Sequence, residues 1–289
     1  MLTALDNPLR SLELKCRRPV EHLLAGEYHS VFKGRGIEFA DVRPYQPGDD
    51  VRTMDWKVTA RTGRPHIKRF IEEREQFIYL AVDLSASVTG DVARQRRTTI
   101  AELAALIALA AVGNHDRVGL LLFTDQVEHV VPPGKGRQHA LRLLEALLTF
   151  QPVGRGTCLR EAMTCLGQLA RRRSVVFVVS DFLVHDAEAA LGALGVRHDL
   201  NAIRLVDPAD STGGLTGLLG IRDAETGEER LIDLAAATTR AQPAGADLRE
   251  ALMGRGVNLL DMPVGGDCVA ALETFFRSRH QRIEGETGG

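Results

Sequence analysis

Residues 77–87 read FIYLAVDLSAS, an apolar run that ends abruptly in an acid and two hydroxyl groups. Aromatic and β-branched residues fill the run without polar interruption, which is typical of a central strand in a parallel sheet covered on both faces. In open α/β sheets, ligands bind beyond the carboxyl ends of the strands. Asp83, Ser85 and Ser87 therefore place three oxygen ligands at the edge where such a sheet binds its ligand.

The sequence after this run alternates between apolar strands and helices. Further strands are predicted at 117–123, 126–131, 174–180, 201–206 and 257–261, and helices at 91–113, 136–149, 158–170, 187–194, 246–254 and 267–280. A small hairpin is expected from 217–222 and 229–234. Such alternation predicts an α/β fold with a doubly wound, mainly parallel sheet, right-handed crossovers and helices on both faces.

The chain changes character near residue 76. Residues 2–26 have an amphipathic helical pattern, and residues 28–75 are dense in Gly, Pro, Arg and Asp. This second segment also contains aromatic residues such as Tyr45 and Trp56, in which a disordered linker would be poor. We therefore expect three parts: an N-terminal, β-containing extension at 1–76, an α/β domain at 77–283 and a disordered tail at 284–289.

Composition narrows the class of protein. The 289 residues are 44% hydrophobic, which is enough for one large core with a smaller appended domain. Lys and Arg number 36 against 38 for Asp and Glu, so the chain has no general attraction to nucleic acid or to an anionic membrane. No apolar segment has the length of a membrane span or the form of a signal peptide, and we expect a cytoplasmic protein. The four cysteines show no CxxC spacing and are expected to be buried or half-buried thiols.

Two more polar residues belong to the same predicted sheet edge. Thr157 follows a glycine-rich turn before a helix, and Asp181 ends the strand predicted at 174–180, as Asp83 ends the first strand. The predicted ligands are Asp83, Ser85, Ser87, Thr157 and Asp181. These carboxylates and hydroxyl groups are suited to a hard divalent cation, which we expect to be Mg²⁺, with Mn²⁺ or Ca²⁺ as the other candidates. Each residue alone is explained equally well as a helix cap or a turn residue, so the metal site rests on the joint pattern.

This set of residues resembles the metal-ion-dependent adhesion site of von Willebrand factor A-type domains. The matching pattern is Asp83-x-Ser85-x-Ser87, then Thr157, then Asp181. The order of elements from Phe77 onward is also similar to that Rossmann-type fold. The resemblance implies that the two serines and the threonine contact the cation directly, while the two aspartates act directly or through water. It also implies that an acidic residue of a partner protein fills the open coordination position.

A second resemblance lies upstream of the first strand. Residues 34–52 read GRGIEFADVRPYQPGDDVR, and they are followed by DW at 55–56, ARTG at 60–63 and EERE at 72–75. This pattern is similar to the signature of the bacterial family called domain of unknown function fifty-eight. Members of that family resemble partners of MoxR-type AAA+ ATPases. The resemblance implies an adaptor or chaperone-like protein whose partners are a MoxR-type ATPase and its client. Many relatives carry membrane helices, which we do not find here, so no membrane attachment is expected.

A metal-dependent hydrolase is the first alternative. Metal-assisted hydrolysis needs a general base near the cation, and His185 or Asp186, just past Asp181, are candidates for that base. Both are explained as well by the loop or helix cap that follows. No HExxH or GxSxG motif or Cys/His arrangement supports an enzyme, and we expect a protein without catalytic activity.

The second alternative is nucleic-acid binding through a basic cluster at 57–69. Its members are Lys57, Arg61, Arg64, His66, Lys68 and Arg69. No acid interrupts the sequence from Lys57 to Ile71, so the cluster could hold a nucleic acid or an acidic protein surface. A solvated face, or ion pairs with Asp49, Asp50 and Asp55, explains the cluster more simply, and no nucleic-acid partner is expected.

Overall fold

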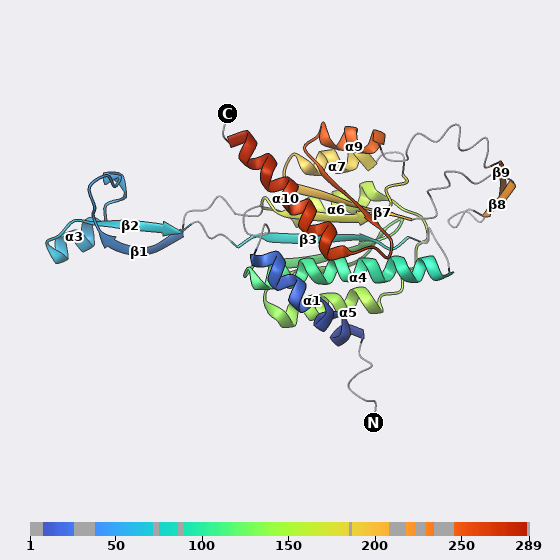
Figure 1. The fold of residues 1–289 in the computed structure, drawn as a ribbon, viewed down its shortest axis with the longest axis horizontal. Helices are drawn as coiled ribbons and strands as arrows, with labels where there is room; N and C mark the ends of the chain where they lie inside the picture. The colour runs from blue at the N-terminus through green and yellow to red at the C-terminus, as the bar shows by residue number, and fades with distance from the viewer. Residues whose placement is uncertain are drawn as a thin grey trace, which may run out of the picture. The chain divides into compact units, whose positions relative to one another are not determined.

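A computed structural model describes residues 8–25, 38–71, 75–85, 90–184, 187–207, 218–222, 229–233 and 246–287. The chain divides into two compact units (Figure 1). The larger unit is Met1–Val31 together with Phe77–Gly289, and the smaller unit is Phe32–Gln76. In the described part of the chain, no helix combines the length and the apolar character that crossing a bilayer requires. All four cysteines are free thiols, and Cys16 and Cys268 are buried.

The larger unit is built on a six-stranded sheet with the order β10-β7-β6-β3-β4-β5. The strands are β3 (Phe77–Asp83), β4 (Arg117–Phe123), β5 (Val127–Gly134), β6 (Val175–Ser180), β7 (Asp199–Val206) and β10 (Asn258–Pro263). Neighbouring strands pair in parallel, except that β5 pairs antiparallel with β4 at one edge. The predicted mixed α/β fold with a mainly parallel sheet is confirmed.

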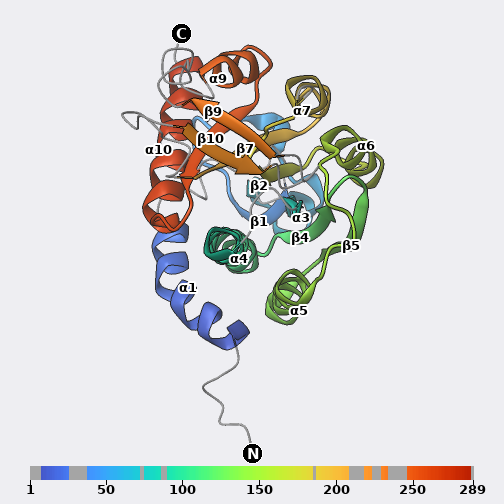
Figure 2. The ribbon, with the colours of Figure 1, turned by 90° about the vertical axis from the view of Figure 1, so that its right-hand side faces the viewer.

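Helices cover both faces of this sheet (Figures 1 and 2). One face carries α4 (Gly90–Gly113) and α5 (Gly136–Thr149), with α1 (Pro8–Ala25) and α10 (Cys268–Thr287) packed against α4. The other face carries α6 (Leu159–Leu169), α7 (Ala187–Gly195) and α9 (Ala246–Met253). This two-sided cover explains why β3 is apolar at every position before its acid: its residues from Ile78 to Val82 are at most 5% exposed.

The buried face of the longest central helix follows from helical spacing. In α4, Leu103, Leu106 and Ile107 are fully buried, at intervals of three and four residues that bring side chains to one side of a helix. Burying each of these side chains contributes about 2 kcal/mol through the apolar area removed from water. On the opposite face of the sheet, Tyr79 and Ala81 of β3 belong to a core cluster with α6 and α7.

Helix α1 belongs to the larger unit, whereas the expected boundary at residue 76 places it in the N-terminal extension. Its inward face supplies the physical reason. Cys16, Val20 and Leu23 recur at helical spacing and are buried. The helix also forms ion pairs with the two helices that it covers, from Lys15 to Glu102 of α4 and from Glu13 to Arg137 of α5.

Two further expectations about element ends are corrected. Helix α10 continues to Thr287, so the predicted disordered tail at 284–289 is helical over most of its length. Extending a helix that is already anchored by packed residues such as Phe276 is much easier than starting a new one. Strand β5 runs through Pro132 and Pro133 to Gly134 instead of ending at 131. An edge strand tolerates proline because one side of its backbone has no partner strand.

The smaller unit is a hairpin with a short helical insertion. Strand β1 (Glu38–Pro44) pairs antiparallel with β2 (His66–Ile71), and the register shifts between Phe39 and Asp41. The 3₁₀ turn η1 (Val51–Thr53) and helix α3 (Trp56–Thr62) lie between the two strands in sequence. The extension therefore contains β-structure, as the sequence predicts. A second hairpin, β8 (Leu218–Arg222) with β9 (Glu229–Asp233), matches the pair of strands expected in the C-terminal part.

Candidate metal centre

The strand order brings three carboxyl ends together. From β3 the chain builds outward to β4 and β5, then crosses to β6 on the other side of β3, so the switch point of the sheet lies at β3. Asp83 is in register with Phe123, the last residue of β4, and Val82 is in register with Val179 of β6. Polar residues that follow β3, β4 and β6 are therefore neighbours at one edge.

Asp83 is deeply buried at this edge. Its side chain is on β3, and the residue is 1% exposed. One carboxylate oxygen, Oδ2, accepts a hydrogen bond from Ser180 Oγ at 2.6 Å, and Oδ1 accepts one from the Ser85 backbone N–H at 2.9 Å. Burial raises the pKa of Asp83 above its ordinary value, although hydrogen bonds from Ser180 and Ser85 oppose the shift. The charged form of this carboxylate is thus costly unless a cation stabilises it.

Asp181 lies beside Asp83 and is paired with an arginine. The charge of Asp181 adds to the rise in the pKa of Asp83, so the two carboxylates interact. Arg96 Nη1, from α4, donates to Asp181 Oδ2 at 2.8 Å, and both side chains are mostly buried. The Leu183 N–H donates to the other oxygen at 3.3 Å. Between them Phe182 is buried with a φ of 56°, a left-handed conformation that turns the chain sharply at this edge.

Thr157 is brought to the edge by a loop fastened to the end of β4. The Cys158 N–H donates to the carbonyl oxygen of Thr124 at 2.8 Å. Glu128 Oε1 accepts hydrogen bonds from the Gly154 N–H at 2.7 Å, the Thr124 hydroxyl at 2.8 Å and the Val153 N–H at 3.1 Å. The N–H of Gly154 is the chief cause of the lowered pKa of Glu128.

Gly154 is required by the close approach of this loop to β4. A Cβ atom at this position would lie 2.0 Å from Asp125 Oδ1 and 2.2 Å from Thr124 Oγ1. Both distances are far below van der Waals contact, and Thr124 is fully buried and held by its own hydrogen bonds. Close packing against β4 therefore explains why the turn before Thr157 has a glycine at this position, and the explanation does not involve a bound ligand.

Four of the five predicted ligands lie in the described residues. Asp83 ends β3, Ser85 and Asp181 follow β3 and β6, and Thr157 lies on the loop held to the end of β4. The Ser85 N–H donates a hydrogen bond to Asp83. Ser87 lies outside the described residues, as do His185 and Asp186, the candidate general bases.

Sequence reasoning missed three residues that shape this edge. Ser180 and Arg96 bind the two aspartates, and Glu128 holds the loop of Thr157. A signal for Arg96 was present: it is four residues before Ile100 and seven before Leu103, so a charged residue occupies the buried stripe of α4. The partnership of Glu128 with residues 153–154 joins segments far apart in sequence, and no local pattern reveals it.

The chemistry of this donor set fits a hard divalent cation. Its side-chain donors are carboxylate and hydroxyl oxygens, the ligands that Mg²⁺ and Ca²⁺ prefer. Asp83 carries a raised pKa because of burial, and a cation would stabilise its charged form. Within the described residues, no cluster of three or more His, Cys, Asp and Glu side chains is arranged to hold a metal, so the hydroxyl groups are needed to complete a site.

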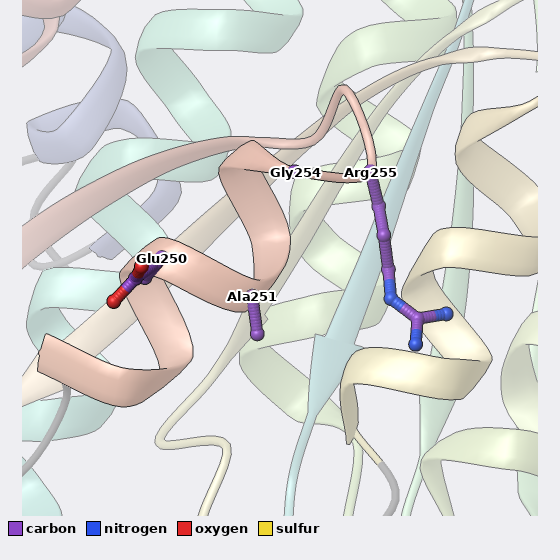
Figure 3. A pocket seen from close by; sticks show the side chains of 4 residues that line it. All are labelled: Glu250, Ala251, Gly254 and Arg255. Atoms are coloured by element: carbon purple, nitrogen blue, oxygen red, sulfur yellow. The ribbon is translucent and has the colours of Figure 1, made fainter.

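A separate hollow lies at the other end of the sheet (Figure 3). It is lined by Glu250, Ala251, Gly254 and Arg255, from α9 and the turn that leads into β10. These residues precede β10, so they are at the amino edge of the parallel sheet, opposite the candidate metal centre. Glu250 and Arg255 do not converge on one point in Figure 3, and the Arg255 side chain lies over Gly192 of α7.

The fold and this edge define a mixed α/β protein with a mainly parallel sheet and a polar constellation at its switch point. The chain belongs to the family described as Protein of unknown function DUF58, whose profile matches residues 41–251. The family expected from the pattern at 34–75 is thereby confirmed.

Relatives support this membership. The chain is 35% identical over 282 residues to Uncharacterized protein Rv1480 of Mycobacterium tuberculosis (strain ATCC 25618 / H37Rv), covering 94% of this chain and 89% of the relative. It is 27% identical over 147 residues to Uncharacterized protein YeaD of Bacillus subtilis (strain 168), covering 51% of this chain and 35% of the relative.

Solved structures are more distant. One is the conserved hypothetical protein BatB from Bacteroides thetaiotaomicron, with 14% identity, a TM-score of 0.44, and 71% of this chain and 99% of that chain covered. Another is an aerotolerance-related membrane protein from Bacteroides fragilis NCTC 9343, with 14% identity, a TM-score of 0.44, and 72% and 99% covered.

Proposed function

We propose that this chain is a metal-dependent protein-interaction module with a von Willebrand A-like domain. Its cation, most readily Mg²⁺, would be held by Asp83, Ser85, Ser87, Thr157 and Asp181. The observation that carries the proposal is the meeting of two mostly buried aspartates, Asp83 and Asp181, where β3 and β6 end side by side at the switch point.

The composition of the site favours capture of a ligand. Hydroxyl donors leave more of the positive charge of the cation unneutralised than carboxylates do. An incoming Glu or Asp from a partner protein then gains a strong charge-assisted contact at the open coordination position. Arg96, which is paired with Asp181, adds a further positive charge at the same edge of the sheet.

The proposed partners are a MoxR-type AAA+ ATPase and its client, with the chain acting as an adaptor in the cytoplasm. Membership of the DUF58 family supports this proposal, because members resemble partners of such ATPases. ATP hydrolysis would belong to the partner. The acidic residue that reaches the cation would come from the ATPase or from the client.

Copurification from cells tests this function. Tagged full-length chain would be recovered in Mg²⁺ or in chelator, as the wild type, as Asp83→Ala and as Asp91→Ala. Asp91 is an exposed aspartate on α4 and serves as the matched control. We expect a MoxR-type ATPase with the wild type and Asp91→Ala in Mg²⁺, and its loss in chelator and with Asp83→Ala. Undiminished recovery in chelator would refute the proposed dependence on a cation.

A further inference from the structure

The smaller unit presents a tryptophan and two cations on one exposed helix face. Trp56, Lys57, Ala60 and Arg61 are exposed residues of α3, at spacings that place them on one side of the helix. We call these four residues the Trp56 face. Trp56 is 70% exposed, which is unusual for the largest apolar side chain of a unit.

The acids near this face do not form ion pairs with its cations. Asp55 caps α3, accepting from the N–H groups of Lys57 at 3.0 Å and Val58 at 3.1 Å. Asp49 is held by Arg43 at 2.7 Å and by the Gln46 N–H at 2.8 Å. Direct ion pairs between these two acids and the basic cluster, one of the two simpler explanations, are therefore not found among the described residues. The N–H of Val58 is the largest cause of the lowered pKa of Asp55, and the charges of Lys68 and Lys57 add to it.

Asp50 is the third acid near the Trp56 face, and it too is bound by a backbone N–H group. Asp50 accepts a hydrogen bond from the Arg52 N–H at 2.9 Å and caps η1. In the part of the unit that the structure describes, no ion pair joins an acid to Lys57, Arg61, Arg64 or Lys68. Positive charge consequently remains available at the surface for a partner.

The smaller unit buries little of its own apolar surface. Among its described side chains at 41–68, Ile67 alone is buried. A segment of this size rarely gains a stable core by itself and usually needs another surface or a covalent staple. Trp56 and Val51, which is 60% exposed, are the apolar side chains that such a surface would cover.

We propose that the Trp56 face is a docking surface for a protein that presents carboxylates around an apolar pocket for Trp56. Tryptophan and arginine are the residues most enriched among those that dominate protein interfaces. Binding of single-stranded nucleic acid would instead call for successive aromatic side chains on which bases stack, and Trp56 is the only aromatic residue of α3.

This surface is additional to the cation-dependent contact proposed above and does not depend on it. None of its residues is a candidate metal ligand. Binding at the Trp56 face should consequently persist in chelator and in Asp83→Ala. A result that refutes one proposal would therefore not count against the other.

The single tryptophan makes a direct test possible. Metal-free full-length chain would be titrated with two acidic 12-residue peptides, with Glu and Leu placed at helical or at strand spacing, and with a single-stranded oligo-dT. We expect a saturable blue shift of the Trp56 emission with at least one peptide, and weaker binding of oligo-dT. A lack of response to both peptides, or tighter binding of oligo-dT, would overturn the proposal.

Variants locate the binding surface. Measured by the anisotropy of a labelled peptide, Trp56→Ala should weaken binding at least about 30-fold, the loss expected for a dominant interface residue. Lys57→Glu/Arg61→Glu should weaken binding similarly, while Arg171→Glu/Arg172→Glu, the same charge change at exposed positions of the larger unit, should not. An equal loss of peptide affinity in both double variants would show that binding reflects general charge attraction, and it would overturn the proposal.

Discussion

Arg96 reaches from α4 to Asp181 and donates a hydrogen bond to its carboxylate at 2.8 Å, so a mostly buried ion pair lies at the switch point of the sheet. The arginine supplies one positive charge to an edge that carries two carboxylates. Within the proposed function, it orients the Asp181 carboxylate, and it lowers the negative charge that a divalent cation would meet.

Replacing Arg96 by methionine should therefore separate these two roles. Leaving Asp181 without its counter-charge should cost about 3 kcal/mol of unfolding free energy in chelator, as expected when one partner of a mostly buried pair is removed. Mg²⁺ should recover much of this loss, because the edge is then more negative. Denaturant melts with and without Mg²⁺ measure both effects, with the exposed Arg94→Met on the same helix as control. A variant that Mg²⁺ stabilises less than the wild type would contradict this account.

Asp83→Asn should make the protein more stable at neutral pH in chelator. Burial raises the folded-state pKa of Asp83, so the native state binds a proton more readily than the unfolded state. Stability then falls as pH rises from the ordinary range of an aspartate through the raised pKa, and the loss is complete above it. Asparagine removes this loss, so the two proteins should have equal stability only at acid pH. Melts across pH 4 to 8 test this, and a less stable variant at pH 7 would show that Asp83 is held charged.

Glu128→Ala should loosen the loop that carries Thr157. Glu128 accepts three hydrogen bonds from the loop and from Thr124, although it is only partly buried. We expect the affinity for Mn²⁺ to fall about tenfold, as when residues that support metal ligands are removed. In the wild type, the same effect should appear as pH falls through the lowered pKa of Glu128, because protonation removes its negative charge. An unchanged affinity for Mn²⁺ would show that Glu128 does not support the metal site.

Gly154→Ala should destabilise the larger unit, by about 1 to 3 kcal/mol, because the added methyl group meets Thr124 and Asp125. Gly167→Ala is the matched control. Gly167 lies inside α6, where a Cβ atom would approach Leu194 Cδ1 to an ordinary 3.5 Å, so alanine should be neutral or stabilising. Thermal melts distinguish the two, and equal melting temperatures would contradict the close approach of the loop.

Most of the sheet could be predicted from sequence because its strands are apolar runs with clear ends. The strand at 117–123 has the predicted bounds because it is an apolar run. The helix at 136–149 has them because a glycine marks the start of an amphipathic segment. Strand β1 was not expected as a strand. Its sequence, EFADVRP, mixes charged residues and a proline with a few apolar ones, and its pairing with β2 makes it a strand.

The candidate centre was predictable only in part. A carboxylate directly after an apolar strand is a local signal, and it located Asp83 and Asp181. The roles of Arg96 and Glu128 arise from contacts between residues 85 and 26 positions apart, and these depend on how the helices and loops pack. The end of α10 was misjudged because a polar, glycine-containing tail can continue a helix that is already anchored.

The central claim is that the edge at β3 binds a divalent cation, and calorimetric titration of Mn²⁺ into metal-free full-length chain tests it most directly. We predict one ion per chain for the wild type and for Asp91→Ala. Affinity should fall more than about a hundredfold in both Asp83→Ala and Asp83→Asn, since a ligand matters at least as much as its supports. No saturable binding to the wild type, or equal binding to the Asp83 variants, would contradict the claim.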